Sequence, residues 1–142
     1  MRIVIMGCGR AGSTLAERLA ADHHVAVIEP DRANLVRLPR SLIDSGAVAV
    51  VEGDGTTSEA LEAAGMEDAD LFIAVSGRDT LNGLAAQKVR FYYRKERVIC
   101  RVKDEDLRRV YESKGIETVN PTELVGDQIL ARITDFTTQG GE

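Results

Sequence analysis

The sequence has few cysteines, no long apolar run and no excess of basic residues, and each shortage excludes a class of protein. Its two cysteines, Cys8 and Cys100, are too few for a disulfide framework. No apolar stretch approaches the ~20 residues that a helix needs to span a bilayer, and the amino terminus lacks the regions of a signal peptide. The formal net charge of −5 argues against a general nucleic-acid binder. We therefore expect a cytoplasmic protein that binds no nucleic acid and does not insert into the membrane.

The length and the residue pattern indicate one α/β domain. The chain has 142 residues, of which 44% are hydrophobic and 29% charged, as in ordinary globular proteins. Short apolar runs predict strands over residues 1–6, 25–28, 47–51, 71–75, 98–102 and 116–119, and helical patterns separate them. This alternation predicts a Rossmann-like, doubly wound, parallel six-stranded sheet in a single domain.

The carboxyl-terminal region carries the last predicted helix and a tail. The helix is expected to begin at Asn120-Pro121 and to end near Ile133. Its apolar residues form a wider set than a surface stripe needs, so they pack either against a partner chain or on the end of the core. Residues 134–142 show no pattern. We therefore predict a domain over residues 1–135 and a tail or linker over residues 136–142.

The first thirty residues carry a glycine-rich motif between two apolar runs. Gly7-Cys8-Gly9-Arg10-Ala11-Gly12 follows the first run, and the second run ends at Glu29, 17 positions after Gly12. A G-x-G-x-x-G sequence alone is weak, and a glycine-punctuated turn without a ligand is the alternative. Strand, glycine loop, helix, strand and acidic residue in this order make the full dinucleotide-binding fingerprint.

Each position of the fingerprint has a physical role. Gly7 permits a tight turn, Gly9 lets a pyrophosphate approach the backbone, and Gly12 lets the helix pack closely on the sheet. The helix start offers free N–H groups and a positive dipole end to phosphates. Glu29 can accept hydrogen bonds from ribose hydroxyls and would repel a 2′-phosphate, which disfavours NADP. Cys8 is expected to be a small loop filler.

The predicted topology gathers four loops at one edge of the sheet. In a doubly wound sheet, ligands bind beyond the carboxyl ends of the strands at the switch point. The segments that follow four of the predicted strands are residues 7–12, 29–32, 53–56 and 76–82. We expect the binding site there. The adjacent His23 and His24 lack further ligands nearby in the sequence, so no metal site is predicted.

Several motifs resemble those of the RCK/KTN (TrkA-N) domain family over about residues 1–135. They are G-C-G-R-A-G, I-E-P-D after the second strand, G-D-G-T after the third, A-V-S-G-R-D-T-L-N after the fourth, I-C-R-V-K-D in the fifth, and V-N-P-T-E-L. The arginine in the glycine loop, the G-D-x-T turn and the D-x-x-N pair are the most specific. The broken stretch from Pro39 to Gly46 and the presence of Gly55 in place of a common alanine depart from the family pattern.

The resemblance implies roles for individual residues. Arg10 would reach phosphates, either in its own chain or across a dimer, and Glu29 would bind ribose with Asp31 or Arg32 nearby. Asp54 and Thr56 would line the adenine side. Ser76 and Asn82 would close the pocket near the phosphates, while Asp79 would cap a helix, and Arg101 would point either to this rim or to an interface. The full set of candidate residues is Gly7, Cys8, Gly9, Arg10, Ala11, Gly12, Glu29, Pro30, Asp31, Arg32, Gly53, Asp54, Gly55, Thr56, Val75, Ser76, Asn82 and Arg101.

For several of these residues a plainer role stays open. Arg10 could be a solvated loop arginine, and Asp54 and Thr56 could form only a turn and a helix cap. The ligand is either ATP/ADP or NAD(H), since a glycine loop and an acidic residue suit both. A guanidinium suited to a phosphate contact favours the adenine nucleotide.

The resemblance implies a regulatory subunit of bacterial potassium uptake systems of the Trk and Ktr types. Such a chain would form homodimers that build a ring, bind a nucleotide, and transmit its occupancy to a separate membrane transporter subunit at the inner face of the membrane. The alternative is an NAD-dependent oxidoreductase or a Rossmann fragment of a larger enzyme. No Tyr-x-x-x-Lys pair and no substrate domain is present, so we expect no catalytic residue.

Overall fold

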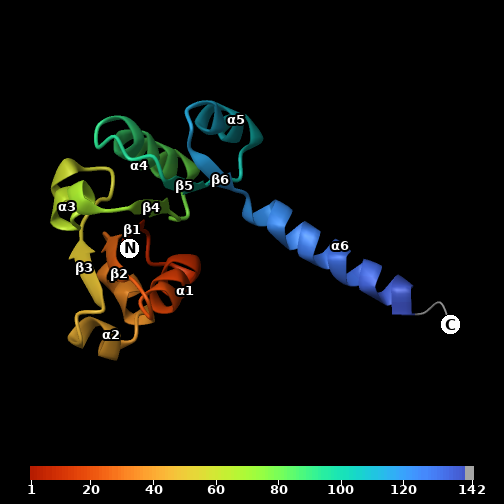
Figure 1. The fold of residues 1–142 in the computed structure, drawn as a ribbon, viewed down its shortest axis with the longest axis horizontal. Helices are drawn as coiled ribbons and strands as arrows, with labels where there is room; N and C mark the ends of the chain where they lie inside the picture. Colours follow the sequence, from red (N-terminus) through yellow and green to blue (C-terminus); the bar gives the residue numbers. More distant parts are fainter. Residues whose placement is uncertain (140–142) are drawn as a thin grey trace.

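The computed structural model describes residues 1–139 and contains a six-stranded sheet in which all paired strands are parallel. The strand order is β3-β2-β1-β4-β5-β6 (Figure 1). The strands are β1 (Arg2–Met6), β2 (His24–Glu29), β3 (Val48–Glu52), β4 (Leu71–Ala74), β5 (Val98–Arg101) and β6 (Glu117–Val119). The predicted fold is confirmed, and every predicted strand lies within one residue of its observed ends.

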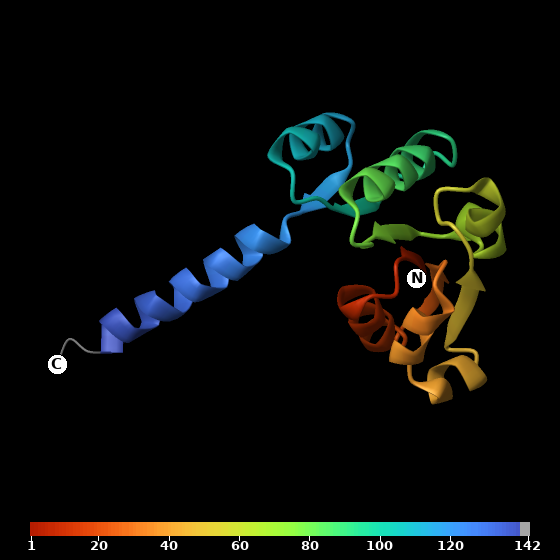
Figure 2. The ribbon, with the colours of Figure 1, turned by 180° about the vertical axis from the view of Figure 1, so that it is seen from behind.

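Helices cover both faces of this sheet (Figures 1 and 2). They are α1 (Arg10–Leu19), η1 (Arg32–Arg37), α2 (Arg40–Asp44), α3 (Ser58–Ala63), η2 (Met66–Asp68), α4 (Asp79–Phe91), α5 (Glu105–Ser113) and α6 (Pro121–Gln139). On one face, Ala16 of α1 packs with Ile5 and Val27. On the other face, buried residues of α3, α4 and α5 pack with Val4 and Phe72. Both faces of the central strands β1 and β4 are therefore buried, which explains their continuous apolar runs.

The connection from β2 to β3 is broken into two short helices. The sequence predicts a helix that ends or kinks near Leu38 and a second turn over residues 40–46, and the structure has the 3₁₀ helix η1 and then α2. The side chain of Asp31 caps η1 by accepting the N–H of Ala33. Pro39 lies between the two helices, where proline removes a backbone donor and disfavours helical geometry in the preceding residue.

The last helix is longer than the sequence predicts. α6 runs from Pro121 to Gln139, so residues 134–139 are helical and the expectation that the helix ends near Ile133 is wrong. Residues 140–142 lie outside the described part of the chain. The predicted domain boundary near residue 135 stays a prediction.

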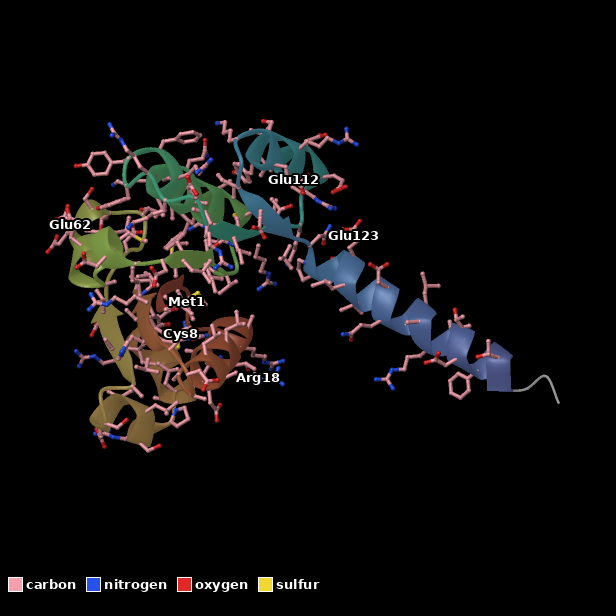
Figure 3. The ribbon with its side chains drawn as sticks, in the orientation of Figure 1. Met1, Cys8, Arg18, Glu62, Glu112 and Glu123 are labelled. Atoms are coloured by element: carbon pink, nitrogen blue, oxygen red, sulfur yellow. The ribbon has the colours of Figure 1, made fainter. Side chains whose placement is uncertain are left out.

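α6 projects away from the rest of the protein (Figures 1 and 2). Its side chains stand clear of the body along most of the helix (Figure 3). The apolar side chains are between 51% and 77% exposed, so they do not complete the core of this chain: Leu124, Val125, Ile129, Leu130, Ile133 and Phe136. Among the described residues, no helix combines the length and apolar character that membrane crossing requires.

Candidate functional site

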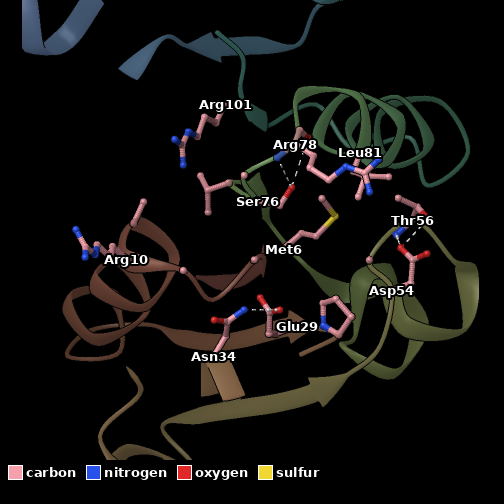
Figure 4. A pocket seen from close by; sticks show the side chains of 17 residues that line it. Met6, Arg10, Glu29, Asn34, Asp54, Thr56, Ser76, Arg78, Leu81 and Arg101 are labelled. Carbon is pink, nitrogen blue, oxygen red and sulfur yellow. Dashed lines mark hydrogen bonds between the residues drawn. The ribbon is translucent and has the colours of Figure 1, made fainter. Parts of the chain in front are cut away.

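A cavity of about 400 Å³ lies at the carboxyl ends of the central strands (Figure 4). This volume falls within the range of small-molecule sites. Its position is the switch point between β1 and β4, where doubly wound sheets bind ligands. The lining residues are Met6, Gly7, Gly9, Arg10, Ala11, Glu29, Pro30, Asn34, Asp54, Gly55, Thr56, Val75, Ser76, Gly77, Arg78, Leu81 and Arg101.

The glycine loop brings the start of α1 to this cavity. Gly7 has a φ of +106°, and its N–H donates to the carbonyl of Ile28 at 2.9 Å. A Cβ at Gly12 would overlap the Gly7 carbonyl oxygen, so the helix packs against the loop more closely than a side chain allows. The loop thus directs the amino end of α1, with its free N–H groups, toward the cavity.

Glu29 is buried at the end of β2 and is already bound on both oxygens. Its Oε2 accepts the N–H of Cys8 at 2.7 Å, and its Oε1 accepts the N–H of Asp31 and the amide of Asn34, both at 3.1 Å. An ionised carboxylate has about four acceptor positions. One position therefore remains for a hydroxyl donor from a ligand.

Asp54 and Thr56 form a local turn beside the cavity. The Oδ1 of Asp54 accepts the Thr56 N–H at 2.9 Å and the Thr56 hydroxyl at 2.7 Å. The backbone N–H bond, then the hydroxyl bond, lowers the pKa of the Asp54 carboxyl below 3.8. The helix cap belongs to Thr57, which accepts the N–H of Ala60 at 3.2 Å. Asp54 therefore stays ionised and keeps Oδ2 available for a ligand.

Three arginines line the cavity and come from different elements around it (Figure 4). They are Arg10 at the start of α1, Arg78 in the β4–α4 loop, and Arg101 at the end of β5. Within the described part of the chain, none of their guanidinium groups takes part in an ion pair. Unpaired guanidinium groups around a helix start favour a ligand that carries phosphate groups.

The β4–α4 loop is fixed by a buried amide. Asn82 is 0% exposed, and its Oδ1 accepts the N–H of Ser76 at 2.9 Å and the Ser76 hydroxyl at 2.6 Å. Its Nδ2 donates to the carbonyls of Ser76 at 2.9 Å and Arg101 at 3.0 Å. Asn82 therefore holds the cavity wall rather than lining it.

Most of the predicted site residues line the cavity, and the structure places six of them elsewhere. The six are Cys8, Gly12, Asp31, Arg32, Gly53 and Asn82. Cys8 is buried, which raises the pKa of its thiol to about 11, and only its backbone serves the site. Arg32 is exposed and pairs with Glu52 at 2.9 Å. A Cβ at Gly53 would contact Ala60, away from the cavity.

Five lining residues are absent from the predicted set: Met6, Asn34, Gly77, Arg78 and Leu81. Gly77, Arg78 and Leu81 lie within the segment 76–82 that the topology already predicted at the site, although they were not named singly. Met6 is the last residue of β1, so the rule that ligands bind at the carboxyl ends of strands could have included it. Asn34 depends on η1, which brings it back to Glu29. The expectation that Asp79 caps its own helix is wrong, because its Oδ2 accepts the backbone N–H groups of Lys103 and Asp104 instead.

The fold and the cavity define a nucleotide-binding domain of the Rossmann class, and sequence comparison narrows the class further. The profile of the TrkA-N domain matches residues 3–121. The Trk system potassium uptake protein TrkA of Streptomyces coelicolor is 40% identical over 134 residues, which cover 94% of this chain and 58% of that protein. The TrkA homolog of Pyrococcus abyssi is 35% identical over 113 residues, covering 79% and 48%. The chain belongs to the TrkA-N domain family, as its motifs indicate, and spans about half the length of these curated relatives.

Three solved structures share the fold. The TrkA-N domain of the inner membrane protein ybaL from Escherichia coli superposes with a TM-score of 0.79 at 24% identity, covering 92% of this chain and 94% of that one. The Kef CTD of Shewanella denitrificans in AMP-bound form gives 0.74 at 19%, covering 100% and 83%. The GsuK channel bound to NAD gives 0.68 at 22%, covering 88% and 22%. At these identities the likeness shows the fold alone.

Proposed function

We propose that this chain is the nucleotide-binding regulatory domain of a potassium uptake system. Its occupancy by an adenine nucleotide would be transmitted to a separate membrane transporter subunit, which would place the chain at the inner face of the membrane. Family membership and the names of the relatives support a role in a potassium uptake system. The observation that carries the proposal is the cavity itself, which is lined by a glycine loop, a buried carboxylate and three arginines that have no ion-pair partner among the described residues.

The lining residues suggest how a nucleotide would lie. The free acceptor position of Glu29 suits a ribose hydroxyl, and Met6 offers an apolar contact for a base beside Asp54, whose free oxygen can accept from the adenine amine. The phosphates would lie against the start of α1, near Arg10. Arg78 and Arg101 then extend the positive surface beyond the first phosphates. This arrangement supports ATP or ADP over NAD(H).

NAD(H) is the second candidate ligand, and an NAD-dependent oxidoreductase is the second candidate function. A structural neighbour was solved with NAD and another with AMP, so the fold accommodates both kinds of ligand in those proteins. The relatives are named as potassium uptake proteins rather than enzymes. Among the described lining residues, no histidine, tyrosine, lysine or cysteine is present to act as a general acid or base beside a nicotinamide, and the carboxylates of Glu29 and Asp54 already accept hydrogen bonds from this chain. We therefore propose a role without catalysis.

We also propose that α6 joins two copies of the chain in a homodimer, from which a ring would be built. The helix projects from the body and exposes six large apolar side chains. An amphipathic helix is stabilised mainly by packing rather than by its intrinsic propensity. A two-fold interface uses the same surface of each copy, so the apolar residues of one α6 would pack against those of the other.

Thermal unfolding of the purified chain with ATP, ADP, AMP, NAD, NADH and NADPH, one at a time, tests the nucleotide proposal. A ligand at a hundred times its dissociation constant adds roughly 2.7 kcal/mol of stability, which raises Tm measurably. We expect the largest shift with ATP or ADP and a reduced shift in Arg10→Ala. Arg18→Ala is the matched control, because Arg18 is an exposed arginine on the same helix that does not line the cavity.

The outcomes separate the candidates. A shift with NADH alone, equal in Arg10→Ala, would favour a redox sensor, and turnover of NADH would favour the oxidoreductase. No shift with any of the six compounds would contradict the site. For the dimer, Leu130→Glu is expected to turn a sedimenting dimer into a monomer, while Asp127→Asn, in the widest gap between the apolar residues of the same helix, leaves the dimer intact. A parent chain that sediments as a monomer would contradict the role of α6.

A further inference from the structure

The first turn of α4 holds the end of β5 through two side chains. The Oδ2 of Asp79 accepts the N–H of Lys103 at 2.9 Å and of Asp104 at 3.0 Å. Three residues later on the helix, Asn82 donates to the carbonyl of Arg101 at 3.0 Å. We call this set of three hydrogen bonds the α4 clamp. It fixes residues 101–104 to the helix that follows the β4–α4 loop.

The α4 clamp joins two segments that line the cavity, the β4–α4 loop and the end of β5. Ser76 and Arg101 both line the cavity, and Asn82 binds the backbone of both. All four hydrogen-bonding positions of the Asn82 amide are occupied, and its side chain is fully buried. Because the Asn82 side chain has no freedom to move by itself, a displacement of the β4–α4 loop is expected to displace residues 101–104 as well.

Residues 101–104 lead directly to α6. The N–H of Val102 donates to the carbonyl of Val119 at 3.0 Å, and β6 pairs with a strand on that side alone, because it is the edge strand. The side chain of Asn120 then caps α6 through the N–H of Thr122 at 3.0 Å.

A second path runs through α5. Asp104 caps this helix by accepting the N–H of Leu107 at 2.9 Å. Arg108 of α5 pairs with Glu123 of α6 at 2.6 Å. Both paths from the cavity to α6 therefore begin at residues that the α4 clamp holds.

We propose that the α4 clamp couples the phosphates of a bound nucleotide to the orientation of α6, with Asp79 and Asn82 as positioning residues. This inference rests on the proposed nucleotide site. Phosphates that contact Arg101 and the Ser76–Arg78 loop would favour one position of residues 101–104. A ligand shifts an equilibrium only through such differential contacts. The three-residue edge strand β6 and the projecting helix are the parts of the chain that this shift would move.

The test measures a distance between α6 and the body. Spin labels on Glu17→Cys in α1 and Gln128→Cys in α6 report it, since both sites are exposed and the native Cys8 and Cys100 are buried. Labelled chains are diluted with an excess of unlabelled chain, so that the distance measured lies within one chain. Calorimetry on the same samples measures nucleotide affinity separately.

The decisive variant is Asp79→Ala, because Asp79 does not line the cavity and its loss removes two of the three bonds of the α4 clamp. We expect ATP to shift the distance in the parent chain and the shift to be lost in Asp79→Ala, with affinity within about threefold of the parent. Asp79→Asn keeps an acceptor oxygen and is expected to retain part of the shift. The matched control is Asp70→Ala, since Asp70 also accepts a backbone N–H, that of Arg2 at 2.7 Å, far from the α4 clamp.

Each result supports or overturns either the coupling role of the α4 clamp or the proposed function. A full shift in Asp79→Ala, or an equal loss in Asp70→Ala, overturns the coupling role. Nucleotide binding without any shift in the parent chain overturns it as well, while leaving the proposed function intact. A parent chain that binds none of the nucleotides overturns the proposed function and this inference with it. If Asp79→Ala does not fold, the comparison of Asp79→Asn with the parent replaces it.

Discussion

Two groups of charged residues line the cavity, the carboxylates (here the acidic wall) and the arginines (here the arginine wall). They differ in how many hydrogen bonds or ion pairs they already make within this chain. On the acidic wall, Glu29 accepts three hydrogen bonds and Asp54 accepts two, all from groups of this chain. On the arginine wall, Arg10, Arg78 and Arg101 have no ion-pair partner among the described residues. The fold thus fixes the carboxylates in place before any ligand arrives, whereas the guanidinium groups are left to a ligand.

Because of this difference, the carboxylates and the arginines are expected to contribute to binding in different ways. A carboxylate that is held rigidly needs no reorganisation to bind a ribose, so its contribution to affinity is preorganised. Long arginine side chains lose rotamer freedom when they bind, and charge-assisted hydrogen bonds to phosphates offset this entropic cost. Variants of the acidic wall should therefore affect stability and affinity together. Variants of the arginine wall should affect affinity alone.

The largest effect is expected from Glu29→Ala. Its loss leaves the buried N–H of Cys8 without an acceptor, which costs about 1–3 kcal/mol of the free energy of unfolding. Nucleotide affinity should also fall by at least about tenfold, or about 1.4 kcal/mol. Urea unfolding and calorimetry measure the two quantities.

The control for Glu29→Ala is Glu52→Ala. Glu52 is the register partner of Glu29 on β3, but it is exposed and pairs only with Arg32. We expect a change within about 0.5 kcal/mol, as for other surface substitutions. Equal destabilisation by the two variants would contradict the distinction between the acidic wall and an ordinary surface carboxylate.

A smaller effect is expected from Arg101→Ala. It should weaken ATP binding by about tenfold, since a charge-assisted hydrogen bond contributes roughly 1.5–3 kcal/mol, but leave AMP and the free energy of unfolding nearly unchanged. Calorimetric titration with both nucleotides measures the difference, and the exposed Arg109→Ala on α5 is the control. Equal losses for ATP and AMP would show that Arg101 does not distinguish the number of phosphates.

The smallest effect concerns the pKa of Asp54. The N–H and hydroxyl of Thr56 lower this pKa in the folded state, so Asp54 contributes stability above its unfolded pKa, and this contribution is lost as the pH falls through the folded value. Thr56→Val removes only the hydroxyl bond. The folded pKa should therefore rise toward 3.8.

A carbon-detected NMR titration of the Asp54 carboxyl measures this change, and Asp54→Asn identifies its signal. An unchanged pKa in Thr56→Val would mean that the backbone N–H alone sets the value.

The fold could be predicted closely because its signals are local. Each strand is a short apolar run, and the glycine loop and Glu29 fix the order of the first unit, so strand limits and topology follow from pattern and rule. The end of α6 could not be predicted, because residues 134–139 carry neither a glycine stop nor a proline to contrast with the helix before them. The exposure of its apolar face also depends on where the helix leaves the sheet, which no local pattern encodes.

The candidate site could be predicted at its strand ends and less well beyond them. Gly9, Arg10, Glu29 and Asp54 belong to motifs with a stated chemical reason, and they line the cavity. Asn34 was missed because its place depends on the 3₁₀ geometry of η1. Asn82 was assigned to the cavity because a side chain in a motif is indistinguishable, in sequence, from one that supports the motif from behind.

Gly9 has a practical consequence for genetics. Its backbone is extended, with φ −73° and ψ −161°, and nothing lies within 4 Å of where a Cβ would stand, although the residue lines the cavity. A Gly9→Val allele would therefore produce a chain that folds and accumulates normally while its side chain fills the space that a pyrophosphate needs. In cells, such an allele shows the phenotype of an empty site while the protein is still present. A deletion removes the site and the protein together, so it cannot distinguish the two.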